Sequence, residues 1–214
     1  MKALVLDFGG PVLKTPFELR DIGERAEGLT PGSYTWTGPF APSADDDWRD
    51  MQAGRMTERD YWQRRAEEYA ALTGGPATFQ ALLRGMYDVD EDLLVRPEAR
   101  AMIAHARDLG MTVIFLTNDL QAFHGREWLD RMTVLRSVDL IVDGSVEHVL
   151  KPDPAIYRLA IDRMGVEADD CLFLDDQPAN VAGAEAVGMR ALWFDVTDPV
   201  GSYDRARAIL AAAS

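Results

Sequence analysis

The chain has 214 residues, enough to bury a substantial core, and its 22 basic and 36 acidic residues give a formal net charge of −14 at pH 7. This charge disfavours extended contact with nucleic acid phosphates or anionic lipid, so we expect no nucleic acid partner and no membrane partner. A lone cysteine, Cys171, excludes an intramolecular disulfide. This single cysteine, the lack of a signal-peptide pattern and the lack of an apolar run long enough to span a bilayer together predict a cytoplasmic protein.

Short apolar runs spread along the chain predict five β-strands: Ala3–Leu6, Met111–Leu116, Val138–Val142, Cys171–Leu174 and Ala191–Phe194. Helix-length segments separate the last four runs. Residues 98–109 and 155–164 each follow a proline and stop at a glycine, which are helix start and stop signals. Strands that alternate with helices predict an α/β fold with a parallel sheet covered by helices on both faces.

Residues 15–95 break this alternation, because they contain helix signals but no convincing strand. Thr57, three residues before Asp60, predicts the start of a helix that continues to Ala71. Residues 28–43 are rich in Gly, Pro, Ser and Thr and predict a loop. We therefore predict an α/β domain formed by residues 1–14 and 96–214, with an α-helical domain inserted at residues 15–95.

Polar residues follow the apolar runs, at the places where parallel strands end. They are Asp7 after the first run, Thr117 and Asn118 after the second, Lys151 beyond the third, and Asp175 and Asp176 after the fourth. Ligands of open parallel sheets bind beyond the carboxyl ends of the strands, so we expect these side chains to converge. Carboxylates brought together repel one another, and a hard divalent cation relieves the repulsion; Mg²⁺ fits best, because it also leaves room for a substrate phosphate.

A carboxylate beside Mg²⁺ can attack a phosphoryl group and form an aspartyl phosphate, which water then hydrolyses. Thr117 and Asn118 can hold the phosphoryl oxygens by hydrogen bonds, and Lys151 can balance charge on the substrate or the nucleophile. Simpler interpretations stay open at this stage: one of the two consecutive aspartates can cap a helix, and Thr117 and Asn118 can simply form a turn.

Four motifs in order, LDFGG, FLTN, KPDPAIY and FLDDQPAN, resemble those of the haloacid dehalogenase-like hydrolase superfamily. The resemblance implies a Rossmann-like core with a helical cap inserted after the first strand. It implies that Asp7 is the nucleophile and a metal ligand, that Lys151 stabilises the charged centre, and that Asp176 binds Mg²⁺ with support from Asp175. The remaining implied roles are substrate binding by Thr117, Asn118 and Gly10, metal contact by the Gly9 carbonyl, and metal contact by Asn180 through water.

Gly9 departs from the pattern of most phosphatases of this superfamily, which have a second Asp at this position. That Asp protonates the leaving group, and the loss of such general acid–base help costs about 10²–10⁴ in rate. The form Asp-x-Gly-Gly resembles a branch near the epoxide hydrolase amino-terminal domains and certain sugar-1-phosphate phosphatases. His124, which follows the second strand, is a candidate proton donor, although a packed or surface histidine is the commoner case.

These observations predict a Mg²⁺-dependent phosphatase that acts on a small phosphorylated metabolite, as a monomer or a homodimer. Two alternatives stay open: a 2-haloacid dehalogenase-type hydrolase, whose halide needs no proton to leave, and a catalytically silent binding or regulatory protein. In the insertion, the aromatic residues Tyr34, Trp36, Trp48 and Trp62 can line a substrate pocket or pack, and the run 45–47 is expected to be solvated.

Overall fold

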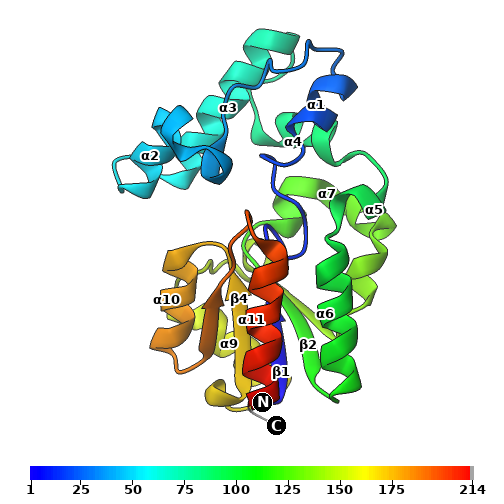
Figure 1. Cartoon of the computed structure of the whole chain (residues 1–214), viewed down its shortest axis with the longest axis vertical. Coiled ribbons are helices and arrows are strands. Elements are labelled where there is room, and N and C mark those ends of the chain that lie inside the picture. Colours follow the sequence, from blue (N-terminus) through cyan, green and yellow to red (C-terminus); the bar gives the residue numbers. More distant parts are fainter. Residues whose placement is uncertain (213–214) are drawn as a thin grey trace. The chain divides into compact units, whose positions relative to one another are not determined.

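The computed structural model describes residues 1–212, which form two compact units (Figure 1). The sheet unit consists of Met1–Lys14 and the chain from Glu91 onward, and the insertion unit is Thr15–Asp90. The sheet unit thus includes residues 91–95, which the sequence assigned to the insertion. The reason is that Leu94 and Val95 are buried and the N–H of Lys14 donates to the Leu94 carbonyl at 2.9 Å. The roles of core and cap stay predictions.

A five-stranded parallel sheet organises the sheet unit, with strand order β3-β2-β1-β4-β5. The strands are β1 (Ala3–Leu6), β2 (Thr112–Thr117), β3 (Leu140–Asp143), β4 (Cys171–Asp175) and β5 (Arg190–Trp193). All four residues of β1, the central strand, are fully buried, as the uninterrupted apolar run predicts for a strand covered on both faces. The predicted α/β fold is confirmed, and each predicted strand lies within one or two residues of the observed one.

Helices cover both faces of this sheet (Figure 1). The α-helices of the sheet unit are α5 (Glu91–Leu94), α6 (Pro97–Asp108), α7 (Leu120–Arg131), α8 (Gly144–Glu147), α9 (Pro154–Met164), α10 (Pro178–Ala186) and α11 (Pro199–Ala212), with short 3₁₀ turns at Thr133–Arg136 and Ala168–Asp170. Helix α6 packs against α11, and α9 packs against α10. Proline begins α6, α9 and α10, where its missing N–H costs no hydrogen bond. None of the helices among residues 1–212 combines the length and apolar character that a membrane crossing requires.

The insertion unit is helical, as predicted. Its helices are α1 (Arg20–Ala26), α2 (Asp46–Gln52), α3 (Glu58–Thr73) and α4 (Phe79–Tyr87), with 3₁₀ turns at Gly38–Phe40 and Pro42–Ala44 inside the predicted loop. Thr57 and Asp60 form a capping box at the start of α3, so the predicted cap is confirmed. The helix continues to Thr73 and ends at Gly74, which adopts a left-handed conformation with φ of 74°.

Aromatic side chains fill the centre of the insertion unit. The ring of Phe17 lies 5.2 Å from Trp48, 5.3 Å from Trp62 and 5.5 Å from Trp36, measured between ring centroids. Gly38 allows this packing, because a Cβ at that position would lie 2.3 Å from the Phe17 ring. These tryptophans therefore pack in the core of the insertion unit, which is one of the two roles expected from the sequence.

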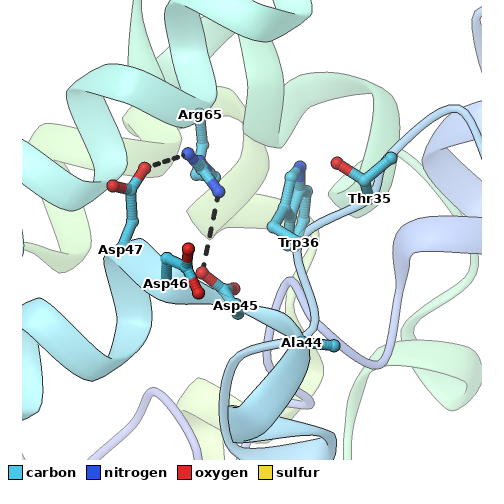
Figure 2. Close-up of a pocket in the computed structure, with 7 residues that line it drawn as sticks. All are labelled: Thr35, Trp36, Ala44, Asp45, Asp46, Asp47 and Arg65. Carbon is cyan, nitrogen blue, oxygen red and sulfur yellow. Dashed lines mark hydrogen bonds and ion pairs between the residues drawn. The ribbon is translucent and has the colours of Figure 1, made fainter.

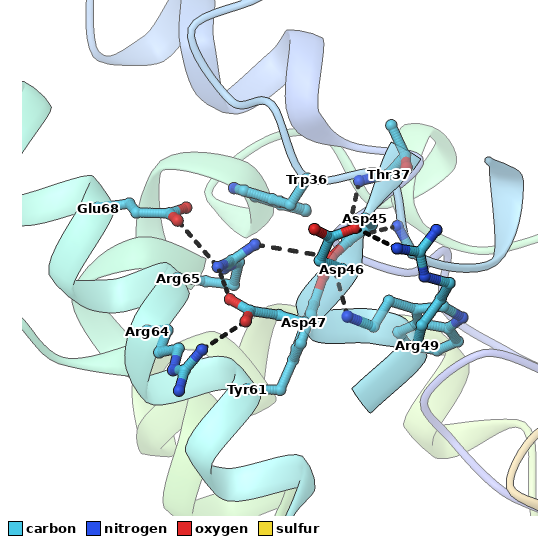
Figure 3. A network of polar contacts seen from close by, with 12 residues as sticks. Trp36, Thr37, Asp45, Asp46, Asp47, Arg49, Tyr61, Arg64, Arg65 and Glu68 are labelled. Atoms are coloured by element: carbon cyan, nitrogen blue, oxygen red, sulfur yellow. Dashed lines mark hydrogen bonds and ion pairs between the residues drawn. The ribbon is translucent and has the colours of Figure 1, made fainter. Parts of the chain in front are cut away.

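A network of charged and polar side chains joins α2 to α3 (Figure 3). Asp45 caps α2 by accepting from the Trp48 N–H at 2.9 Å, and it also accepts from the Tyr61 hydroxyl at 2.8 Å. Arg65, which is buried, pairs with Asp47 at 2.5 Å. The expectation of a solvated run at 45–47 was therefore wrong for Asp45, which is only 4% exposed, because these bonds hold it inside. We call the set Asp45, Asp47, Tyr61, Arg64, Arg65 and Glu68 the insertion network.

A pocket of about 270 Å³ adjoins the insertion network (Figure 2). Its lining residues are Thr35, Trp36, Ala44, Asp45, Asp46, Asp47 and Arg65. Within residues 1–212, two buried nitrogen atoms of this lining, Nε1 of Trp36 and Nε of Arg65, have no hydrogen-bond acceptor. Both side chains are more than nine-tenths buried and pack inside the unit, so neither offers an accessible group to a ligand.

Candidate active site

Asp7 lies directly beyond the carboxyl end of β1, at the centre of the sheet. Its backbone N–H donates to the Leu174 carbonyl of β4 at 2.8 Å, which continues the strand pairing by one residue. Its carboxylate oxygen Oδ1 accepts from the Phe8 N–H at 2.8 Å and lies 2.8 Å from Nζ of Lys151. The other oxygen, Oδ2, takes part in neither of these two contacts.

Lys151 brings an ammonium group between two carboxylates. Its Nζ lies 2.8 Å from Oδ1 of Asp7 and 2.6 Å from Oδ2 of Asp175, and the side chain is 1% exposed. Burial lowers the pKa of this ammonium, but the charges of Asp175 and Asp7 and their hydrogen bonds outweigh burial and raise it. Lys151 therefore stays positively charged at neutral pH and can offset the charge of two aspartates.

Asn118 holds the backbone of Lys151. Its Oδ1 accepts from the Lys151 N–H at 2.7 Å, and its Nδ2 donates to the Lys151 carbonyl at 3.1 Å. Both ends of the side-chain amide are thus engaged with the loop that carries the ammonium. This geometry supports a positioning role for Asn118, and its predicted role in substrate binding stays a prediction.

Asp175 is the last residue of β4 and is fully buried. Its two oxygens accept hydrogen bonds from Lys151 Nζ at 2.6 Å, from the Gln177 N–H at 2.8 Å and from the Asn180 amide at 3.1 Å to each oxygen. Asn180 is in turn fixed by the Tyr157 hydroxyl, which donates to its carbonyl at 2.8 Å. So many donors leave Asp175 little capacity to bind a cation directly and make it a support for its neighbours.

Oxygen atoms of three aspartates gather at this end of the sheet. One carboxylate oxygen from each of Asp7, Asp175 and Asp176 lies within 4.8 Å of the other two. We call these three residues the acidic cluster. Three carboxylates and one ammonium, that of Lys151, give a formal charge of −2. Burial, together with the charge of Asp175, outweighs the opposing effect of Lys151 and raises the pKa of Asp7 to about 7. The cluster is therefore suited to a divalent cation with oxygen ligands.

The loop after β1 is fixed by residues that the sequence did not single out. Nε of Arg96 donates to the Gly10 carbonyl at 2.7 Å, and the Tyr203 hydroxyl of α11 donates to the Pro11 carbonyl at 2.9 Å. Gly10 has φ of +79°, and a Cβ there would lie 2.7 Å from Cγ of Asp176. Gly9, by contrast, is exposed, and a Cβ there would meet nothing within 4 Å. A side chain at position 9 is therefore sterically allowed.

Thr117 and Asp143 end the neighbouring strands β2 and β3 and face each other in the sheet register. Thr117 is buried at the same end of the sheet as Asp7, as expected from the sequence. Asp143 directly follows the third apolar run but was not among the predicted site residues. Its carboxylate accepts from the Gln121 N–H at 2.7 Å and from the Ser145 hydroxyl at 2.8 Å. Asp143 therefore holds the segments that follow both strands.

His124 does not have the properties that its candidate role as a proton donor requires. It stacks on Trp128, with 4.0 Å between ring centroids, and Trp128 in turn contacts Phe8 edge-on at 6.4 Å. Burial lowers the pKa of His124 to about 4, so the imidazole is neutral at pH 7. The stacking and burial match the packed histidine that the sequence analysis treated as the commoner case, and they argue against a protonated donor at neutral pH.

A model of haloacid dehalogenase-like hydrolases matches residues 1–188. The chain belongs to this family. A phosphoserine phosphatase of Thermus thermophilus is 32% identical over 160 residues, which are 71% of this chain and 61% of that protein. The (S)-2-haloacid dehalogenase 1 of a Pseudomonas species is 25% identical over 191 residues, 88% of this chain and 78% of that protein. The chain thus spans less than two thirds of the length of the phosphoserine phosphatase.

The family also has this fold in solved structures. YfnB of Bacillus subtilis, a HAD hydrolase solved with bound magnesium, superposes with a TM-score of 0.62 at 16% identity, covering 90% of this chain and 86% of that one. The family resemblance inferred from the four motifs is confirmed, and so is the helical segment inserted between β1 and β2. The similarity extends to phosphatases and dehalogenases alike, so it establishes a hydrolase family and not one reaction.

Proposed function

We propose that this protein is a Mg²⁺-dependent phosphomonoester hydrolase that acts on a small phosphorylated metabolite. The observation that carries the proposal is the acidic cluster, in which carboxylate oxygens of three aspartates lie within 4.8 Å of one another and the Lys151 ammonium contacts two of the three, Asp7 and Asp175. A dehalogenase needs the nucleophile but no cation, so a third carboxylate beside it would only add repulsion. A phosphatase uses the same arrangement to bind a cation and, through it, an anionic substrate.

Asp7 is the proposed nucleophile. Its Oδ2 attacks the phosphorus atom of the substrate, a bond between Oδ2 and phosphorus forms, and the bond between phosphorus and the ester oxygen breaks. Water then attacks the phosphorus of the aspartyl phosphate, which releases inorganic phosphate and restores the carboxylate. Phe8 N–H and Lys151 Nζ both bind Oδ1, so they fix the carboxylate in one orientation while Oδ2 reacts.

The donor set fits Mg²⁺, because Asp7 and Asp176 offer carboxylate oxygens and Gly9, which is exposed, can offer its backbone carbonyl. When bound, Mg²⁺ supplies positive charge to the phosphoryl oxygens. Lys151 supplies the second positive charge and is held in place by Asn118 and Asp175. Thr117 is the proposed hydroxyl donor to a phosphoryl oxygen, and Asn180 keeps Asp175 oriented.

Gly9 provides no proton for the leaving oxygen, and the neutral His124 provides none at pH 7. The leaving group must then take its proton from water or depart without one. This favours substrates whose leaving group is a weak base, such as acyl phosphates, anomeric sugar phosphates and aryl phosphates. Hydrolytic dehalogenation is the second candidate, and the long alignment with a haloacid dehalogenase together with Gly9 favours it.

The test is a hydrolysis screen with acyl, sugar and aryl phosphates and with 2-haloacids, each with Mg²⁺ and with a chelator. We expect phosphate release that requires Mg²⁺, and a loss on the order of 10⁴-fold or more in Asp7→Asn, because the nucleophile is removed. Asn keeps the size of the side chain, so the unfolding temperature of this variant serves as the control for folding. Halide release that survives chelation would replace the proposal with the dehalogenase, and no turnover in either panel would favour a binding protein.

A further inference from the structure

Asp176 stands one residue beyond the end of β4, where regular strand pairing has stopped. The last pair in the register of β4 and β5 joins Asp175 to Trp193, and the N–H of Phe194 donates to the Asp175 carbonyl at 2.9 Å. The next carbonyl, that of Asp176, accepts a hydrogen bond from Nε1 of the Trp193 indole at 2.9 Å. A side chain of β5 therefore extends the hydrogen bonding of the sheet to the residue that carries the cluster's third carboxylate.

The carboxylate of Asp176 is constrained from a second direction. It lies so close to the α-carbon of Gly10 that an added Cβ would stand 2.7 Å from Cγ and 2.9 Å from each oxygen. Gly10 itself is fixed through its carbonyl by Arg96. The side chain of Asp176 thus contacts a rigid loop, and its backbone is tied to β5.

We infer that Trp193 is a positioning residue for the acidic cluster, setting the peptide of Asp176 so that its carboxylate faces Asp7. The inference rests on the proposed function, because it gives the carboxylate a cation to bind. Trp193 is 47% exposed, so burial of its ring explains little of why a tryptophan stands there. Its indole N–H, by contrast, makes a specific hydrogen bond to the Asp176 carbonyl. Outer hydrogen bonds that orient metal ligands are typically worth about 10–100-fold in metal affinity.

The experiment compares two substitutions by isothermal titration with MgCl₂. Trp193→Phe keeps an aromatic ring and removes the N–H, and Trp193→Leu removes both. If the hydrogen bond positions Asp176, both variants bind Mg²⁺ about tenfold more weakly than the wild type, and the metal-free Phe variant unfolds at the wild-type temperature. If the ring matters only for packing, the Phe variant keeps the wild-type affinity, and the inference is overturned. Val200→Ala, at a position that is 53% exposed in the first turn of α11, is the matched control and should bind Mg²⁺ normally.

The titration also separates this inference from the proposed function. A wild-type protein that binds no Mg²⁺ overturns both. A wild-type protein that binds Mg²⁺, with a Trp193→Phe variant that binds it equally well, overturns the positioning role alone. The KM and kcat of the Phe variant, measured at saturating Mg²⁺, provide a further check. Excess metal should restore activity that is lost through weaker metal binding, but it should not restore activity that is lost through a distorted nucleophile.

Discussion

The acidic cluster of the sheet unit and the insertion network both bury aspartates beside a basic residue, yet the balance of charge differs. In the insertion network, Asp47 pairs with both Arg64 and Arg65. The carboxylate of Asp45 is stabilised by the N–H groups of Thr37, Gly38 and Trp48. In the acidic cluster, one ammonium group, that of Lys151, pairs with both Asp7 and Asp175. The two aspartates of the insertion network thus have two arginines beside them, whereas Asp7 and Asp175 share one lysine.

The pKa values of two aspartates show the same difference. Burial raises the pKa of both Asp7 and Asp45. At Asp45 the hydrogen bonds from Gly38, Trp48 and Tyr61 outweigh burial, and the net pKa lies below its ordinary value. At Asp7 burial and the neighbouring Asp175 dominate over Lys151, and the pKa rises to about 7. A lowered pKa, as at Asp45, is typical of an aspartate that the fold stabilises as an anion. A raised pKa, as at Asp7, is typical of functional sites.

The largest effect that we predict is a gain in hydrolysis rate when a carboxylate is added beside the acidic cluster. Gly9 is exposed, and a side chain there meets nothing within 4 Å, so Gly9→Asp should fold normally. If proton transfer to the leaving oxygen limits the rate, this variant should hydrolyse alkyl phosphates about 10²–10⁴-fold faster than the wild type. The gain should be small for aryl phosphates, whose leaving group needs no proton. Gly9→Asn, which has a similar size, is the control and should show no gain; equal rates in all three proteins would contradict the assignment.

The second prediction concerns stability, when a basic residue is removed from beside the acidic cluster or from the insertion network. Lys151→Met leaves the buried carboxylates of Asp7 and Asp175 without their cation, and Arg65→Met does the same to the buried Asp45; such losses cost about 3–5 kcal/mol in the free energy of unfolding. Mg²⁺ should restore part of the stability of Lys151→Met, because a bound cation replaces the missing charge. It should restore none in Arg65→Met, where backbone N–H groups already occupy Asp45. Urea unfolding with and without Mg²⁺ measures both, and rescue of both variants would show that the two groups do not differ in cation binding.

Much of the sheet unit was readable from the sequence, because each strand is a short uninterrupted apolar run followed by a polar residue. That rule placed Asp7, Thr117 and Asp175 at one end of the sheet, and it also pointed to Asp143, which the analysis passed over. The bonds that fix the site could not be read in the same way. Tyr203 donates to a carbonyl 192 positions away in the sequence, and such a contact depends on the packed fold.

The insertion unit was less readable, for a physical reason. Three consecutive aspartates resemble a solvated run, and nothing local shows that Asp45 caps α2 and accepts hydrogen bonds from the residues of the preceding loop. The end of the unit was placed five residues late because α5 is helical like the insertion, and helical character alone does not reveal which unit a helix packs against. Leu94 and Val95 pack with the sheet unit.

The smallest effect that we predict concerns Asp45. Asp45→Asn removes the charge and leaves several buried donors with a weaker acceptor, which should lower the free energy of unfolding by about 1–3 kcal/mol. Because the pKa of Asp45 is lowered in the folded protein, its contribution is fully present above the unfolded value of 3.8 and is lost as the pH falls through the folded pKa. The wild type and the variant should therefore differ at pH 6 and converge below pH 3.8. Asp50→Asn, which alters an exposed pair with Arg55, is the matched control and should change stability by less than about 0.5 kcal/mol. A difference in the free energy of unfolding between wild type and Asp45→Asn that stayed constant down to low pH would show that the charge of Asp45 contributes nothing to stability. The contrast with Asp7 would then be contradicted.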